Sequence, residues 1–115
     1  MNISATNITI HVKQLDAAIS FYESIGFRLK NRWDNYCAQL TAEGITIGLH
    51  PSSNEEILGS SGTVSIGFTT ADFEETKAAM NKLGIKNIYR KEAGGEFIHF
   101  TDPDGTALYF IKAKE

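Results

Sequence analysis

The sequence contains few cysteines and prolines and has no long apolar run. Its single cysteine, Cys37, excludes an intramolecular disulfide and a multi-cysteine zinc site, so we interpret it as a small buried hydrophobic residue without a role. No apolar stretch reaches the roughly 20 residues that span a bilayer. Residues 1–4 show neither the charged start nor the apolar stretch of a signal peptide. We therefore expect a cytoplasmic protein with no membrane partner.

Neither sign of charge is in large excess. The 115 residues include 11 Lys and Arg against 14 Asp and Glu, a formal net charge of -3. No basic stripe is present to neutralise phosphates, so nucleic acid is not an expected partner. A hydrophobic content of 42% in a chain of this length is sufficient for the core of one domain.

An internal repeat is the main feature that is present. Residues 8–12 match residues 66–70, and the same separation relates Gly26 to Gly84. A slightly larger separation relates the later parts of the two copies, which is typical of a duplicated module. We expect a single domain over 1–115, with a first module at about 1–50, a linker at 51–62 and a second module at about 63–115.

Each copy contains a strand, a helix and three further strands. Asp16 is placed to cap a helix that runs to about Ile25, and Asp72 is placed to cap a second helix. Gly26 and Gly84 provide the left-handed residue that ends each helix. The later strands are expected at 28–33, 36–40, 45–50, 88–90, 97–101 and 106–112. Because strands outnumber helices, the sequence predicts an α+β protein.

Alternation along the strands predicts two unlike faces for each sheet. The large apolar face, which we expect to pack on the helices, comprises Ile8, Ile10, Val12, Ile45, Ile47, Leu49, Val64, Ile66, Phe68, Leu108 and Phe110. The other face is small or polar, and Gly48, Gly67 and Ser65 leave room above it, where exposed strands usually carry longer charged side chains. We interpret this face as the lining of a cavity. A plain solvent-exposed face is the alternative.

Two motifs resemble a known family. The stretch 8–27, with its Phe21-Tyr22 pair ahead of the helix-ending glycine, is similar to the opening strand and helix of the glyoxalase, bleomycin-resistance and extradiol-dioxygenase superfamily, known as the vicinal oxygen chelate fold. The second motif is the Asp-Pro-Asp-Gly turn at 102–105. The resemblance implies two βαβββ repeats that form an incompletely closed eight-stranded barrel around a ligand cavity, with helices on the outer face. It also implies a homodimer.

Active members of that superfamily hold a divalent metal with one side chain, usually His, Gln or Glu, from the first and last strands of each module. The matching positions here are Asn7, Gly48, Ser65 and Tyr109. A cation needs anionic oxygens or imidazoles to replace its lost hydration. We therefore expect no tightly bound metal and no other cofactor.

The three histidines, His11, His50 and His99, are expected to share the cavity face, where they are candidates for acid–base catalysis. If they converge, three imidazoles could bind zinc or iron. A hydrogen-bonded polar lining is the simpler alternative. The residues expected to contact a ligand are Asn7, Thr9, His11, Trp33, Tyr36, Gly48, His50, Ser65, Gly67, His99 and Tyr109. Arg32 or Glu96 is expected to add a charged contact at the mouth.

Two functions remain open at this point. The first is small-molecule binding of the glyoxalase and bleomycin-resistance type, without metal and without turnover. The alternative is a lyase, isomerase or dioxygenase that uses the cavity histidines for metal binding or acid–base catalysis. A fold supports many chemistries, so the choice depends on the geometry of the site.

Overall fold

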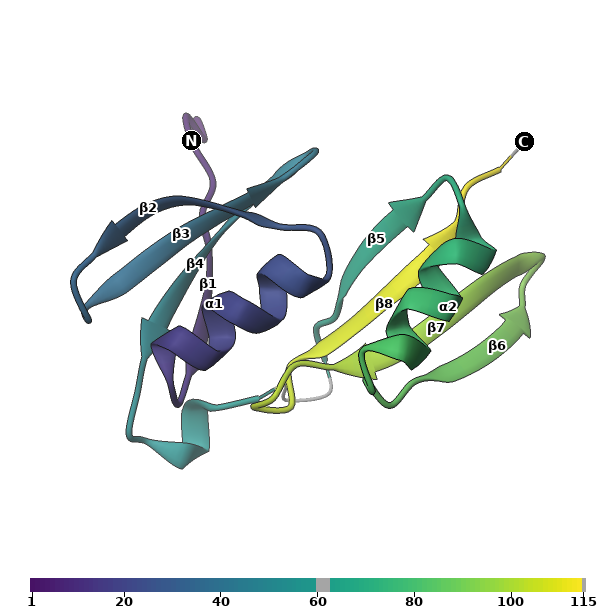
Figure 1. Ribbon diagram of the computed structural model, residues 1–115. Coiled ribbons are helices and arrows are strands. Elements are labelled where there is room, and N and C mark those ends of the chain that lie inside the picture. The colour runs from purple at the N-terminus through teal and green to yellow at the C-terminus, as the bar shows by residue number, and fades with distance from the viewer. Residues whose placement is uncertain (60–62, 115) are drawn as a thin grey trace. The chain divides into compact units, whose positions relative to one another are not determined.

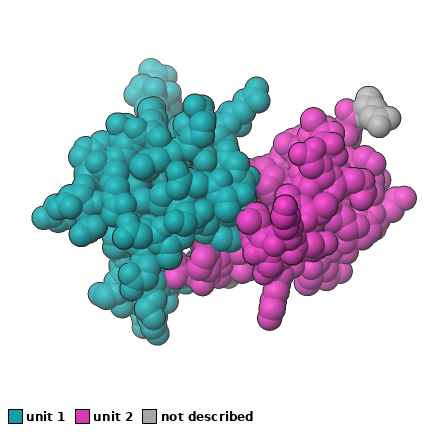
Figure 2. All heavy atoms as spheres, in the orientation of Figure 1, with its two compact units in different colours: residues 1–59 teal, residues 60–115 magenta. Residues whose placement is uncertain are grey.

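The computed structural model describes residues 1–59 and 63–114 (Figure 1). The chain divides into two compact units, residues 1–59 and 60–115, which Figure 2 colours separately. Each unit contains one α-helix and a four-stranded mixed sheet, in the order βαβββ. The predicted α+β class and the two βαβββ repeats are confirmed. Residues 60–62 of the expected linker lie outside the described residues.

The first unit contains β1 (Ile8–Val12), α1 (Leu15–Ser24), β2 (Arg28–Trp33), β3 (Cys37–Ala42) and β4 (Ile45–Pro51). Its sheet has the strand order β1-β4-β3-β2, in which β1 is parallel to β4 and the other pairs are antiparallel. A short 3-10 helix, Glu55–Ile57, follows β4. Figure 1 shows α1 lying over one face of this sheet, and it packs on β2, β3 and β4.

The second unit contains β5 (Ile66–Thr70), α2 (Phe73–Lys82), β6 (Ile88–Glu92), β7 (Gly95–Thr101) and β8 (Ala107–Lys112). Its strand order, β5-β8-β7-β6, and its single parallel pair, β5 with β8, repeat those of the first unit. In Figure 1, α2 likewise lies over one face of its own sheet. None of the helices formed by residues 1–59 and 63–114 has the length and apolar character needed to cross a membrane.

Both helix ends, and the start of α2, follow the sequence prediction. The Asp72 side chain caps α2 by accepting a hydrogen bond of 3.0 Å from the Glu75 backbone N–H. Gly26 and Gly84 follow their helices with φ of 116° and 73°. Glycine adopts this left-handed conformation without steric cost, so each helix ends where the sequence predicts.

The start of α1 differs from the prediction. Gln14 precedes the helix without a side-chain capping hydrogen bond, and Asp16 lies inside the first turn. The helix begins earlier because the Leu15 side chain is buried in the core, which brings that residue into the helix. The Asp16 carboxylate instead pairs with Arg32 of β2, with 2.7 Å between Oδ1 and Nη1.

The apolar faces of the two sheets form the cores of the units. Buried members of the predicted apolar face are Ile10, Val12, Ile47, Leu49, Leu108 and Phe110. Ile45, Ile66 and Phe68 are partly buried. The prediction is wrong for Ile8, which is 39% exposed, and for Val64, which is 69% exposed. Ile8 is the first residue of β1 and Val64 lies before β5, so both exposed residues are at the starts of strands, whereas Ile10 and Val12 further along β1 are buried.

Candidate functional site

A hollow of about 580 Å³ lies on the sheet of the first unit. Gly48 of β4 is at the centre of its floor, and the strand register places Thr9 of β1 on one side and Gln39 of β3 on the other. A Cβ atom added to Gly48 would meet nothing nearer than 3.7 Å, so it would make only ordinary van der Waals contacts there. The neighbouring Leu49 points to the opposite, helix-covered face and is fully buried.

Polar and aromatic side chains surround this floor. Thr46 and His50 stand two residues to either side of the central glycine on β4 and therefore share its face. Asn7 precedes β1, while Trp33 and Cys37 are paired in register at the end of β2 and the start of β3. All five line the hollow. The lining contributed by the described residues contains no Asp, Glu, Lys or Arg.

Hydrogen bonds to neighbouring side chains set what two groups in the hollow can offer a ligand. The Asn31 Nδ2 group donates to Gln39 Oε1 at 3.2 Å, which leaves the Gln39 Nε2 group as a donor. The Thr41 hydroxyl donates to the Ile45 carbonyl at 3.2 Å and lies 3.1 Å from Thr46 Oγ1. A hydroxyl has one hydrogen and two lone pairs, so Thr46 keeps a lone pair for accepting whichever of the two hydroxyls donates to the other.

Two of the three histidines are neighbours. His11 of β1 and His50 of β4 are partners in the parallel register, and their ring centroids are 6.4 Å apart. His50 is exposed and lines the hollow, whereas His11 is partly buried beside it. His99 belongs to β7 of the second unit. Within residues 1–59 and 63–114, no group of three His, Cys, Asp or Glu side chains is placed to hold a metal ion.

The second unit has the same strand pairing with different side chains. Gly67 of β5 is the register partner of Tyr109 of β8, and the Tyr109 ring lies directly over Gly67, where it would overlap an added Cβ atom. Phe97 and His99 of β7 flank that ring, with centroids 6.0 and 5.8 Å from the Tyr109 centroid. The sequence predicts room above Gly67, and this is wrong because Tyr109 fills it.

Gly67→Ala is expected to lower the free energy of unfolding by about 1–3 kcal/mol, because the new methyl group displaces the Tyr109 ring from Phe97 and His99. Adding Tyr109→Ala removes the overlap, so the double variant should be more stable than the sum of the two single losses predicts. Urea unfolding of the four proteins measures this coupling. Gly48→Ala, the matched change in the first unit, should cost little, and an equal loss there would contradict the assignment.

The hollow does not include three further residues that the sequence predicted as ligand contacts: Tyr36, Ser65 and Arg32. Tyr36, in the turn between β2 and β3, is 78% exposed, and Ser65 is exposed just before β5. Neither belongs to the part of the lining that the structure describes. Arg32 turns toward α1, where it pairs with Asp16 and donates to the Asp34 carbonyl at 2.8 Å. The expectation that Arg32 adds a charge at the mouth is wrong, because alternation places it on the helix side of β2.

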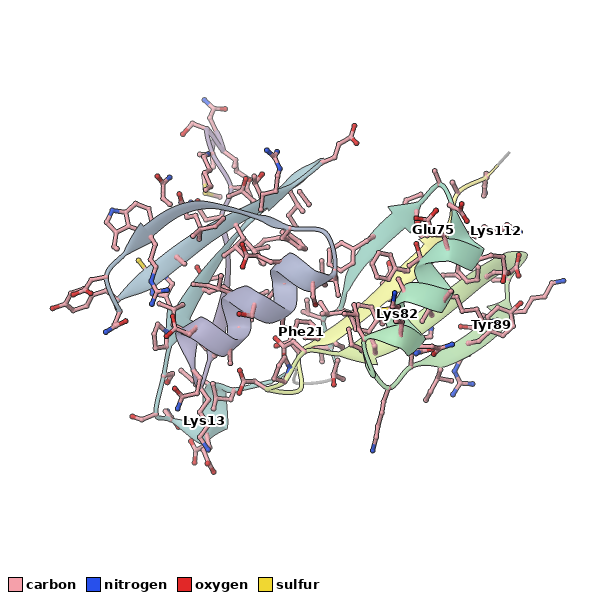
Figure 3. All side chains as sticks on the ribbon, viewed as in Figure 1. Lys13, Phe21, Glu75, Lys82, Tyr89 and Lys112 are labelled. Atoms are coloured by element: carbon pink, nitrogen blue, oxygen red, sulfur yellow. The ribbon has the colours of Figure 1, made fainter. Side chains whose placement is uncertain are left out.

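Glu96, the other charged residue expected at the mouth, is held by residues of the second unit. Tyr89 donates a hydrogen bond of 2.8 Å to Glu96, and Lys112 Nζ lies 3.1 Å from the same carboxylate; Tyr89 and Lys112 are labelled in Figure 3. The hydrogen bond from Tyr89, with that from Lys112, holds the pKa of Glu96 below its ordinary value. The same bond raises the pKa of Tyr89. The Glu96 carboxylate is therefore already paired.

Six residues of the described lining were not among the predicted contacts: Ile8, Cys37, Ala38, Gln39, Thr46 and Ile47. Cys37 was interpreted as buried, but it is only partly buried and faces the hollow. The available signal was alternation along β3, where Cys37 and Gln39 alternate with the buried Ala38 and Leu40. Thr46 shares the face of Gly48 by the same rule.

The four positions that match the superfamily's metal ligands do not fit a divalent cation. Gly48 has no side chain, and the Tyr109 ring is packed over Gly67. Asn7 and Ser65 offer only neutral oxygens. Magnesium and calcium require anionic oxygens, and transition metals favour imidazole or thiolate. These four positions therefore lack the donors that hold a divalent cation.

Comparisons with known proteins agree with the fold. A family model described as the Glyoxalase/Bleomycin resistance protein/Dioxygenase superfamily matches residues 5–110. The fosfomycin resistance protein FosX from Listeria monocytogenes is 18% identical, with 99% of this chain and 96% of that chain covered and a TM-score of 0.81. A lactoylglutathione lyase from Agrobacterium tumefaciens is 16% identical, with 98% and 96% covered and a TM-score of 0.74.

A bleomycin-binding protein, solved in complex with bleomycin, is also similar. It is 20% identical, with 97% of this chain and all (100%) of that chain covered and a TM-score of 0.70. No curated protein matches the sequence significantly. At these identities the structural likeness shows a shared fold and no more.

Proposed function

The chain belongs to the glyoxalase/bleomycin resistance protein/dioxygenase superfamily, and from this we propose that it is a small-molecule binding protein that works without a metal ion. The observation that carries the proposal is the hollow over Gly48. Small-molecule pockets typically measure about 300–1,000 Å³ and combine apolar walls with a few polar groups. Trp33, Gln39 and Thr46 provide this combination. Metal independence is supported by the four matching positions, none of which carries a carboxylate or an imidazole.

We also infer that residues 1–115 act as one cytoplasmic domain and that the protein is a homodimer. The family match spans both units, which supports their working together. An exposed apolar side chain, Ile57, which is 44% exposed in the 3-10 helix, is consistent with a contact to a second copy. The superfamily resemblance supports the same assembly.

Gly48→Val is expected to weaken ligand binding at least about tenfold, or roughly 1.4 kcal/mol, because its side chain occupies the centre of the hollow. Ligands are first found by a thermal-shift screen, since a compound that binds only the folded chain raises its melting temperature. The first compounds to screen are bleomycin, fosfomycin and lactoylglutathione, which appear in the names of the similar proteins. Calorimetry then compares each hit on the wild type and on Gly48→Val, with and without EDTA.

The graded control is Gly48→Ala, which adds one carbon and should weaken binding less than valine does. EDTA should leave the affinity unchanged, and the bound compound should be recovered unaltered. A screen in which no compound depends on position 48 would contradict the binding function. Metal near one ion per chain, whose removal abolishes binding, would contradict metal independence.

A second candidate function, acid–base catalysis, is favoured by the adjacent His11 and His50 rings. One imidazole of such a pair can take a proton from a bound molecule while the other returns it. His50 lines the hollow and would contact the substrate directly. Conversion of a bound compound that His50→Gln abolishes, while binding persists, would favour this function over simple binding.

A further inference from the structure

We propose that the ligand of the hollow over Gly48 is uncharged and joins a flat ring to an amide-like edge, with a hydrogen-bond donor beside an acceptor. This inference rests on the proposed binding function and names the chemical class of the ligand. It follows from three features of the lining: its charge, its hydrogen-bonding polarity and its single tryptophan.

The first feature is the charge of the lining. The described lining residues include no Asp, Glu, Lys or Arg. Arg32, the residue before Trp33, is positively charged, but its guanidinium group pairs with the Asp16 carboxylate on the α1 side of the sheet. Apart from the His50 imidazole, the described lining offers a charged ligand no ionic partner to replace its lost hydration, and burying an unpaired charge is costly. The hollow therefore discriminates against anions and cations alike.

The second feature is the pairing of donor and acceptor. Gln39 has its amide oxygen occupied by Asn31 and presents an N–H donor, whereas Thr46, whose hydroxyl lies 3.1 Å from that of Thr41, keeps a lone pair as an acceptor. Gln39 is the register partner of Gly48, and Thr46 lies two residues before Gly48 on the same strand face. Both groups therefore border the same floor. A primary amide, with its C=O beside its N–H, satisfies both at once.

The third feature is the aromatic wall. Trp33 lines the hollow and keeps 49% of its surface exposed, so an indole face is available to a ligand. Flat rings pack on indole in offset or edge-on arrangements that contribute about 0.5–1.5 kcal/mol beyond the area they bury. A ring that carries an amide can therefore use Trp33 while its polar edge reaches toward the floor.

Three probes of nearly equal shape test this inference: nicotinamide, which is neutral; nicotinate, an anion; and 1-methylnicotinamide, a cation. Two residues report on the hollow, because Trp33 is the only tryptophan and Cys37 the only cysteine of the chain. Trp33 fluorescence quenching and protection of Cys37 from a thiol reagent are measured at pH 8.5, where free imidazole is neutral. Nicotinamide should bind at least about tenfold more tightly than either charged probe.

Quenching measured on Gly48→Val gives the baseline for collisional quenching, because this variant keeps Trp33 while its valine side chain fills the hollow. Gln39→Glu removes the donor and adds a negative charge, so it should weaken nicotinamide and favour 1-methylnicotinamide roughly threefold or more. Gln14→Glu, the same change before α1, should leave the three affinities unaltered.

Equal or tighter binding of a charged probe that depends on position 48 would overturn the uncharged class and leave the binding function intact. Failure of all three probes to protect Cys37 at millimolar concentration would also overturn it. The ligand screen with Gly48→Val would then decide the binding function separately.

Discussion

Leu49→Ala is expected to lower the free energy of unfolding by about 2–5 kcal/mol, whereas Gly48→Ala, one residue earlier, should leave it unchanged or slightly raised. The Leu49 side chain is fully buried on the α1 side of β4, so its truncation leaves a cavity. The Gly48 position opens into the hollow, with no atom within 3.7 Å of an added Cβ. Adjacent residues of one strand should thus differ by several kcal/mol.

Urea unfolding of the wild type and the two variants provides the measurement, with equal m-values showing that only stability has changed. His50→Ala is a further control, because His50 shares the exposed face of Gly48 and should cost little. A large loss in Gly48→Ala with little change in Leu49→Ala would mean that the register of β4 is shifted by one residue.

Asp102→Ala is expected to cost about 2–4 kcal/mol of stability. Asp102, in the turn before β8, is only 3% exposed, and its Oδ1 accepts hydrogen bonds of 2.9 Å from the backbone N–H groups of Asp104 and Thr106. Alanine leaves both donors without this acceptor. The Asp-Pro-Asp-Gly segment is therefore a turn organised from inside by its first residue, in agreement with a structural role for that motif.

Asp102→Asn is the matched variant, since its side-chain oxygen can accept the same two hydrogen bonds without the charge. It should retain more stability than Asp102→Ala in the same denaturation experiment, because hydrogen bonds to a neutral acceptor are weaker but still satisfy the donors. Equal losses for the two variants would indicate that the carboxylate charge, rather than these two bonds, determines the effect of Asp102.

Local features of the fold could be predicted because their causes lie within a few residues. Gly26 and Gly84 end their helices through their own backbone freedom. Asp72 caps α2 through a residue three positions later. The buried face of β4 follows from alternation alone, since any strand places successive side chains on opposite faces. The prediction for the start of α1 was wrong because burial in the core draws Leu15 into the helix.

The candidate site could be predicted only in part. Alternation correctly placed Thr9, Gly48 and His50 on one face, and all three line the hollow. The same rule predicted room above Gly67 as well, although the Tyr109 ring covers it. Nothing local distinguishes the two glycines, because the difference lies in a partner strand about forty residues away along the chain.

The sequence by itself therefore determined the duplicated βαβββ units, the helix ends and the two faces of each sheet, because these depend on backbone freedom and side-chain periodicity. Only the tertiary structure decided which glycine opens a hollow, that Arg32 pairs with Asp16, and that Gln39 and Thr46 present a donor and an acceptor. Each of these depends on where a side chain from another element comes to rest. Such contacts form only when strand pairing brings distant segments together, and a pattern read along one chain does not contain them.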